Sequence, residues 1–102
     1  MTDYNGAYPD LVVQRGGSTI AHGTGTAGAV ASLVAANPKR VELTVTNTGT
    51  TTDTVFLGAT AVASGNGILL AAGEKTTIKT TAEVFFVAGV GTPVVAYLEV
   101  SA

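Results

Sequence analysis

Short runs of alternating apolar and polar residues, separated by turns rich in Gly, Asn and Pro, recur along the chain. The clearest run is residues 40–47, in which Val41, Leu43 and Val45 fall on one face and polar side chains fall on the other. Residues 94–100 show the same two-residue period. A period of two is typical of a β-strand with one face buried.

The remaining runs are shorter and are bounded by turn residues. Residues 29–36 fit a helix by spacing and composition and a strand by length, because Asn37-Pro38 ends the run after eight residues; we prefer the strand. Further strands are predicted at residues 10–14, 18–22, 54–58, 61–63, 68–70, 75–80 and 83–88, loops or turns at 23–28, 48–53, 64–67 and 72–74, and a hairpin loop at 89–93. Turns at intervals of about 8–12 residues are the spacing of a sandwich or a barrel.

The composition supports the same fold class. The 102 residues include 17 Thr, 14 Val and 13 Gly, and β-branched side chains fit a pleated sheet better than a helix. We therefore expect an all-β protein, a small single-domain antiparallel β-sandwich or barrel over residues 10–102. Residues 1–9, with one Pro and two Tyr, are expected to form an extended N-terminal arm.

Charge and cysteine content exclude several classes of protein. The chain has no Cys, which excludes a disulfide scaffold, a zinc finger and a thiol nucleophile. The net charge is −2 with only five basic residues, too few for a surface that follows a nucleic-acid backbone. No apolar run is long enough to cross a membrane as a helix, and the first residues do not resemble a secretory signal.

The titratable residues form no recognisable catalytic pattern. His22 is the only His, and we expect an ordinary residue at the end of a strand. Asp3, Asp10 and Asp53 do not have the spacing of a calcium loop, and the Gly-rich residues 23–28 lack the Lys of a phosphate-binding loop. We expect no catalytic, cofactor or metal site and no enzymatic activity; a small hydrolase would have to depend on His22.

Four residues are the candidates for binding a partner. Lys39 and Arg40 are the only adjacent basic pair and precede a predicted strand, so an ion pair is expected, either to a partner or within the domain. Tyr4 and Tyr8 lie in the predicted arm and offer large contact areas with polar tips.

The order of features from residue 37 to residue 100 resembles a small domain of tailed-phage virion proteins. That pattern has an Asn-Pro-x-Arg turn, a strand ending in Asn, an aromatic strand ending in Gly, a Gly-x-x-Leu-x-x-Gly-Glu segment, and an aromatic strand followed by a Gly-containing loop. The corresponding segments here are residues 37–40, 43–47, 55–58, 67–74 (one residue longer, with Ala72 in place of the usual Pro), and 84–92. The N-terminal third lies outside the resemblance.

The resemblance implies a capsid decoration, or cement, protein. Such a protein is made in the host cytoplasm and is placed on the capsid surface of the virion, where it stabilises the head. The implied partners are the major capsid protein and neighbouring copies of the chain, with a homotrimer as a candidate state.

The alternative is a module of a tail or fibre that binds a cell-surface glycan or another virion protein. Glycan binding would need an exposed aromatic platform, whereas Phe56, Phe85 and Phe86 are predicted to lie mainly in the core.

Overall fold

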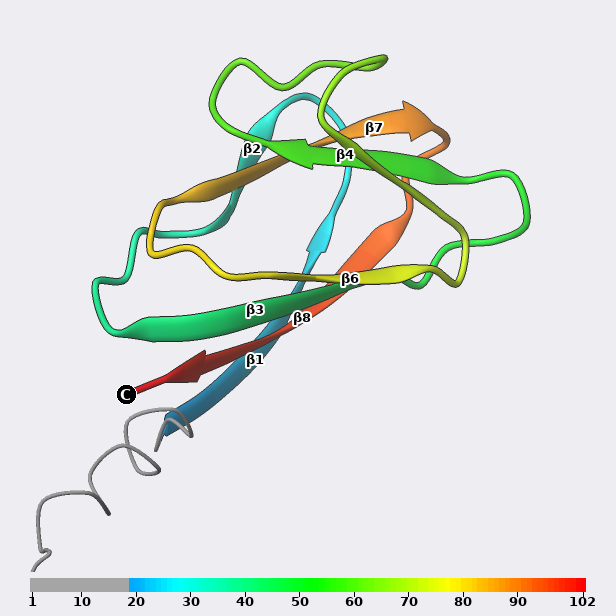
Figure 1. Cartoon of the computed structure of the whole chain (residues 1–102). Helices are drawn as coiled ribbons and strands as arrows, with labels where there is room; N and C mark the ends of the chain where they lie inside the picture. The colour runs from blue at the N-terminus through cyan, green and yellow to red at the C-terminus, as the bar shows by residue number, and fades with distance from the viewer. Residues whose placement is uncertain (1–18) are drawn as a thin grey trace, which may run out of the picture.

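The computed structural model describes residues 19–102, which form two four-stranded antiparallel sheets packed face to face (Figure 1). In spatial order, sheet A contains β1 (Thr19–Thr26), β8 (Val94–Ser101), β3 (Arg40–Asn47) and β6 (Lys75–Ile78), and sheet B contains β2 (Ala31–Val34), β7 (Val84–Val90), β4 (Thr54–Gly58) and β5 (Ile68–Ala71). The all-β prediction is confirmed, and the architecture is a sandwich. The predicted arm at residues 1–9 and the strand predicted at residues 10–14 lie outside the described residues.

The strand pairings are nested. β1 pairs with β8, β2 with β7, β3 with β6 and β4 with β5, and the β3–β8 and β4–β7 pairings complete the two sheets. Eight antiparallel strands in this nested order form a jelly roll. Viral capsid domains, lectins and cupins share this architecture, so the fold alone does not assign a function.

The core lies between the sheets and follows the alternation of the strands. Leu43 and Val45 of β3, Val55 and Leu57 of β4 and Val95 of β8 are fully buried. The half-buried character predicted for residues 40–47 is confirmed, and residues 29–36 contain a strand. Burial of these aliphatic side chains is the main favourable contribution to folding.

A buried amide ends β3. The Asn47 side chain donates hydrogen bonds to the carbonyl oxygens of Asp53 (3.2 Å) and Leu70 (3.0 Å), and its Oδ1 accepts one from the Gly49 N–H (2.8 Å). Asn47 is completely buried, so each unmade bond would cost free energy. These contacts tie the 48–53 loop and β5 to the end of β3.

The loop predicted at residues 23–28 is wrong for its first four residues, which continue β1. A β-carbon at Gly23 would lie 2.7 Å from the Tyr97 hydroxyl oxygen, and one at Gly25 would lie 2.8 Å from Cζ of Phe86. The two glycines therefore leave room for aromatic rings beside the strand. Sequence neighbours alone could not reveal these rings, which come from β7 and β8.

Two further local predictions are wrong. Residues 61–63 form part of a loop in place of a short strand; Val62 is buried there, and its N–H bonds to the Ala59 carbonyl (2.9 Å). The turn after β7 is not a hairpin, because β7 belongs to sheet B and β8 to sheet A. Turn chemistry indicates where the chain bends but not which sheet receives the next strand.

Candidate interaction surfaces

Arg40 is used inside the domain. Its side chain is fully buried, and its Nε donates to Glu99 Oε2 at 2.7 Å. Nη1 donates to the carbonyl oxygens of Thr80 (2.9 Å) and Ala82 (2.8 Å), and Nη2 donates to that of Ala35 (2.6 Å). Four of the five N–H donors of the guanidinium group therefore have partners.

This network corrects the assignment of Arg40 as a partner-binding residue. Of the two roles left open by the sequence, the structure gives Arg40 the internal ion pair, because a buried guanidinium with four of its five donors bonded has little left to offer another protein. Its neighbour Lys39 is exposed and remains a candidate contact. Tyr4 and Tyr8 lie outside the described residues.

The outward face of β8 is an exposed apolar stripe. Val95 is buried and Tyr97 packs against the core, so Val94, Ala96, Leu98 and Val100 point away from it. Val94 and Leu98 are 43% and 42% exposed, respectively. Ile20 of β1 lies opposite Val100 and is 68% exposed, which extends the stripe across two strands.

Polar side chains, most of them Thr, flank this stripe. Leu98 lies between His22 of β1 and Thr44 of β3, and Ala96 lies between Thr24 and Thr46. On the outward side of β1, β8 and β3, Glu42 is the only carboxylate or basic group apart from His22. We call the stripe and its flanks the β8 face; its members are Ile20, His22, Thr24, Thr26, Glu42, Thr44, Thr46, Val94, Ala96, Leu98 and Val100. An apolar centre depleted of charge is the pattern of a protein-binding patch.

The alternation in β8 is evident in the sequence, but it does not show which face of the strand is outward. Both sides of residues 94–100 carry large apolar groups, so periodicity gives two candidate core faces. Only the packing of Val95 and Tyr97 under the sheet decides between them. The β8 face is therefore a candidate binding site that could not be predicted from the sequence.

Sheet B also has an apolar outward face. Phe56 and Phe85 are half-buried on that side, and Leu69, opposite Phe56, is 52% exposed. The prediction that these two Phe lie in the core is wrong, whereas Phe86 is buried as predicted. Both faces of β4 and β7 carry aromatic or aliphatic groups, and hence hydrophobicity alone did not separate inside from outside.

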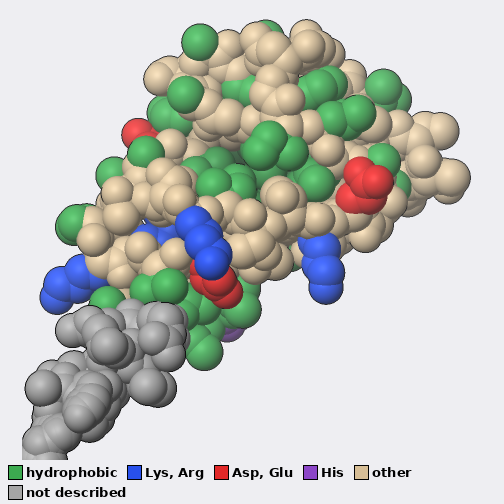
Figure 2. Space-filling model, viewed as in Figure 1, with side chains coloured by type: hydrophobic (Ala, Val, Ile, Leu, Met, Phe, Trp, Pro, Cys, Tyr) green, Lys and Arg blue, Asp and Glu red, His purple; other side chains and the backbone are tan. Residues whose placement is uncertain are grey.

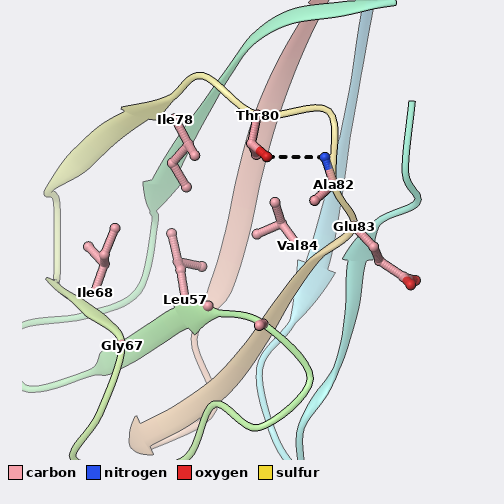
Figure 3. Close-up of a pocket in the computed structure, with 10 residues that line it drawn as sticks. Leu57, Gly67, Ile68, Ile78, Thr80, Ala82, Glu83 and Val84 are labelled. Atoms are coloured by element: carbon pink, nitrogen blue, oxygen red, sulfur yellow. Dashed lines mark hydrogen bonds between the residues drawn. The ribbon is translucent and has the colours of Figure 1, made fainter. Parts of the chain in front are cut away.

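A cleft of about 380 Å³ opens at the side of the sandwich. Green hydrophobic atoms line a hollow between the two sheets in the space-filling view (Figure 2). In the close-up, Leu57, Ile78 and Val84 point into this space and Glu83 points away (Figure 3). The Thr80 hydroxyl oxygen accepts the Ala82 N–H at 3.1 Å, and most of the other lining side chains are aliphatic, so the cleft suits an apolar group.

Reactive groups do not converge in the described part of the chain. His22 lies within β1, opposite Leu98. Among residues 19–102, no three His, Asp or Glu side chains gather as they would around a metal ion. No helix in the same range has the length and hydropathy for a membrane crossing.

No family model matches the sequence, and no curated protein does. Among solved structures, a chain from Bacillus endospore appendages, described as a novel family of disulfide-linked pili, is similar to this one. The match covers 85% of this chain and 92% of that chain, at 16% identity and a TM-score of 0.44. A likeness of this degree carries no argument about function.

Proposed function

We propose that this chain is a structural protein of a tailed-phage virion, a decoration protein that docks on the major capsid protein and stabilises the head. The observation that carries the proposal is the exposed apolar stripe on β8. A stripe of this kind is disfavoured in water unless another surface covers it. The order of motifs from residue 37 to residue 100 supplies the virion context.

The fold suits a mechanical role. The stripe lies on a central strand of sheet A, with β1 on one side and β3 on the other, so the docking surface is held by strand pairing on both edges. Threonine hydroxyls beside the stripe cost less to desolvate than charges would. Decoration requires no reaction, only buried area between neighbouring capsid subunits, and we propose no enzymatic activity.

The other predicted contacts take peripheral positions in this proposal. Lys39 is an exposed charge at the start of β3 and would add a contact at the rim, where charges contribute little affinity. Tyr4 and Tyr8 would anchor the arm on the lattice or on a neighbouring copy. Bridging of neighbouring copies, with a homotrimer as one arrangement, belongs to the same proposal.

The direct test is to mix the purified protein with heads that lack it and to count copies per particle. Decoration predicts saturation at a copy number set by the icosahedral lattice. It also predicts that bound heads resist heat or chelator better than bare heads. Saturation at a handful of copies would move the protein to the tail, and no binding to heads would overturn the proposal.

Deletion of residues 1–9 tests the arm separately. The shortened chain should remain folded, which circular dichroism can check, and should bind heads more weakly. Unchanged binding would remove Tyr4 and Tyr8 from the proposal without affecting the role of the β8 face.

One observation favours a second candidate, a tail or fibre module that binds glycans. Half-buried Phe56 and Phe85 on the outward face of sheet B are the kind of rings on which sugars stack. Polar partners for sugar hydroxyls are few there, since the Thr54 hydroxyl already accepts the Val90 N–H at 2.8 Å. A glycan array probed with the protein and with a Phe56→Ala variant decides: binding that is lost in the variant would support this candidate.

A further inference from the structure

The apolar cleft lies between two free strand edges. Within residues 19–102, β6 pairs only with β3 and β5 pairs only with β4. Each therefore keeps one row of backbone N–H and C=O groups without a strand partner. An unpaired edge is a ready template for another strand.

The cleft beside these edges can accept side chains from such a strand. Ile78 of β6 lines it, together with buried Leu57 and Val84, and Ile68 of β5 is 47% exposed at its mouth. A strand added to β6 would pair its backbone with the edge and place the side chain opposite Ile78 at the cleft, which is the recognition mode of strand addition.

We infer that the occupant is residues 10–14 of a second copy of this chain. This segment, Asp10-Leu11-Val12-Val13-Gln14, lies outside the described residues. Its sequence predicts a strand. Placed antiparallel to β6, it sets Leu11 opposite Ile78 and Val13 opposite Thr76, both directed inward. Asp10 then lies beside Lys79 on the outward side, so the charges are complementary.

The register shows why a second copy is needed. In this register Gln14 would face Lys75 of β6. Lys75 lies opposite Thr46 of β3, Thr46 lies opposite Ala96 of β8, and Ala96 lies opposite Thr24 of β1. The added strand would lie four strand spacings from β1, or about 19 Å, and Thr24 is about 16 Å along β1 from Thr19. The gap from Gln14 to Thr19 is thus about 25 Å, whereas the chain between them spans at most about 18 Å.

A head-to-tail contact of this kind joins each copy to the next. It closes into a ring when the rotation between copies allows it and grows into a chain when it does not. The contact specifies how neighbouring copies join, and because it uses neither the β8 face nor a capsid, it can be tested separately from docking on the head.

Disulfide trapping in the purified protein tests the inference, because the natural chain has no Cys. Equal amounts of a Leu11→Cys variant and an Ile78→Cys variant are mixed and oxidised. Side chains directly opposite each other on paired strands come close enough for a disulfide. The mixed dimer should exceed the statistical half of all dimers and should form several-fold faster than with a Val12→Cys variant, whose side chain points outward.

A double variant, Leu11→Cys with Ile78→Cys, distinguishes a segment that docks on its own copy from one that docks on a second copy. Linkage between copies gives a ladder of covalent oligomers on a non-reducing gel. A cross-linked monomer without a ladder would overturn the second-copy assignment. Statistical pairing in the mixture, equal to that of the Val12→Cys control, would overturn the inference as a whole.

Exchange of charges provides a test that does not alter the cleft. Asp10→Lys should slow the Leu11–Ile78 cross-link by about two- to fivefold, the effect of one exposed ion pair. Adding Lys79→Asp to the partner should restore the rate. Both positions are polar, so the fold is retained, and failure of the second change to restore the rate would contradict the register. Because no capsid is present, these outcomes do not depend on the decoration proposal.

Discussion

The start of β3 and the outward face of β8 use their side chains in opposite ways. At the start of β3, a full positive charge is buried and bonded to Glu99 and to three carbonyl oxygens. On β8, four apolar side chains at alternate positions point outward, two of them more than 40% exposed. The charge that was a candidate for binding a partner stabilises the fold, and one of the two apolar faces of β8 is exposed to solvent.

The contrast indicates how to separate folding from binding in this chain. A buried charge bonded within its own domain through four of its five donors reports on stability, since removing it leaves buried groups without partners. An exposed aliphatic residue on a paired strand contributes little to stability, and its exchange for a polar group reports on binding. Variants in the two regions should therefore affect different measurements.

The largest effect is expected for Arg40→Ala. The substitution leaves Glu99 and three carbonyl groups without their donor, and breaking a buried ion pair from one side costs about 3–5 kcal/mol. The free energy of unfolding, measured by urea denaturation, should fall by that amount. Lys39→Ala removes an equal charge from an exposed neighbour and should change it by less than about 0.5 kcal/mol. Equal effects of the two variants would mean that the Arg40 network does not stabilise the fold.

A smaller loss is expected for Gly25→Ala, which tests the packing between β1 of sheet A and β7 of sheet B. The new β-carbon would lie 2.8 Å from the buried Phe86 ring, and such overpacking costs about 1–3 kcal/mol. Gly28→Ala is the matched control, because a β-carbon there meets nothing within 4 Å. Thermal unfolding of both variants checks the expectation, and a Gly25→Ala protein as stable as the control would show that the ring shifts freely.

A comparison of β3 with β1 shows which parts of the fold could be predicted from the sequence and which could not. β3 was predicted correctly because its alternation and its ends, Asn37-Pro38 and Asn47, are local signals. The turn at residues 72–74 was predicted for the same reason, and Gly73 there has a φ of 83°. The continuation of β1 through Gly23 and Gly25 depends on rings from other strands, which no local window contains.

The candidate sites were harder to predict than the fold. Arg40 was selected for its charge, but its partners are separated from it by up to 59 positions in sequence. The outward direction of Leu98 depends on which side of β8 covers the core. The cleft takes its lining from β4 to β7 and the turns between them, and hence exists only in the assembled sandwich.

Leu98→Asp tests whether the β8 face is the surface that binds heads. Placing a charge in the centre of the β8 face should weaken binding to bare heads by about tenfold or more, as for a central interface residue. The unfolding free energy should change by less than about 1 kcal/mol, because Leu98 is already exposed. Leu69→Asp, on the outward face of sheet B, is the matched control and should leave binding unchanged. Loss of binding in Leu69→Asp alone would transfer the docking surface to sheet B.

The smallest effect is expected for Thr44→Val, which separates the apolar stripe from its hydroxyl flank. Thr44 lies opposite Leu98, and its hydroxyl shares a 3.0 Å hydrogen bond with that of Thr77. Valine keeps the β-branched shape, so the strand is retained, and loss of one exposed hydrogen bond should change the unfolding free energy by less than about 0.5 kcal/mol. If apolar contact dominates docking, the variant should bind heads as well as or slightly better than the natural chain. A tenfold loss would mean that the hydroxyl groups are themselves recognised, and the β8 face would then be a polar site with an apolar centre.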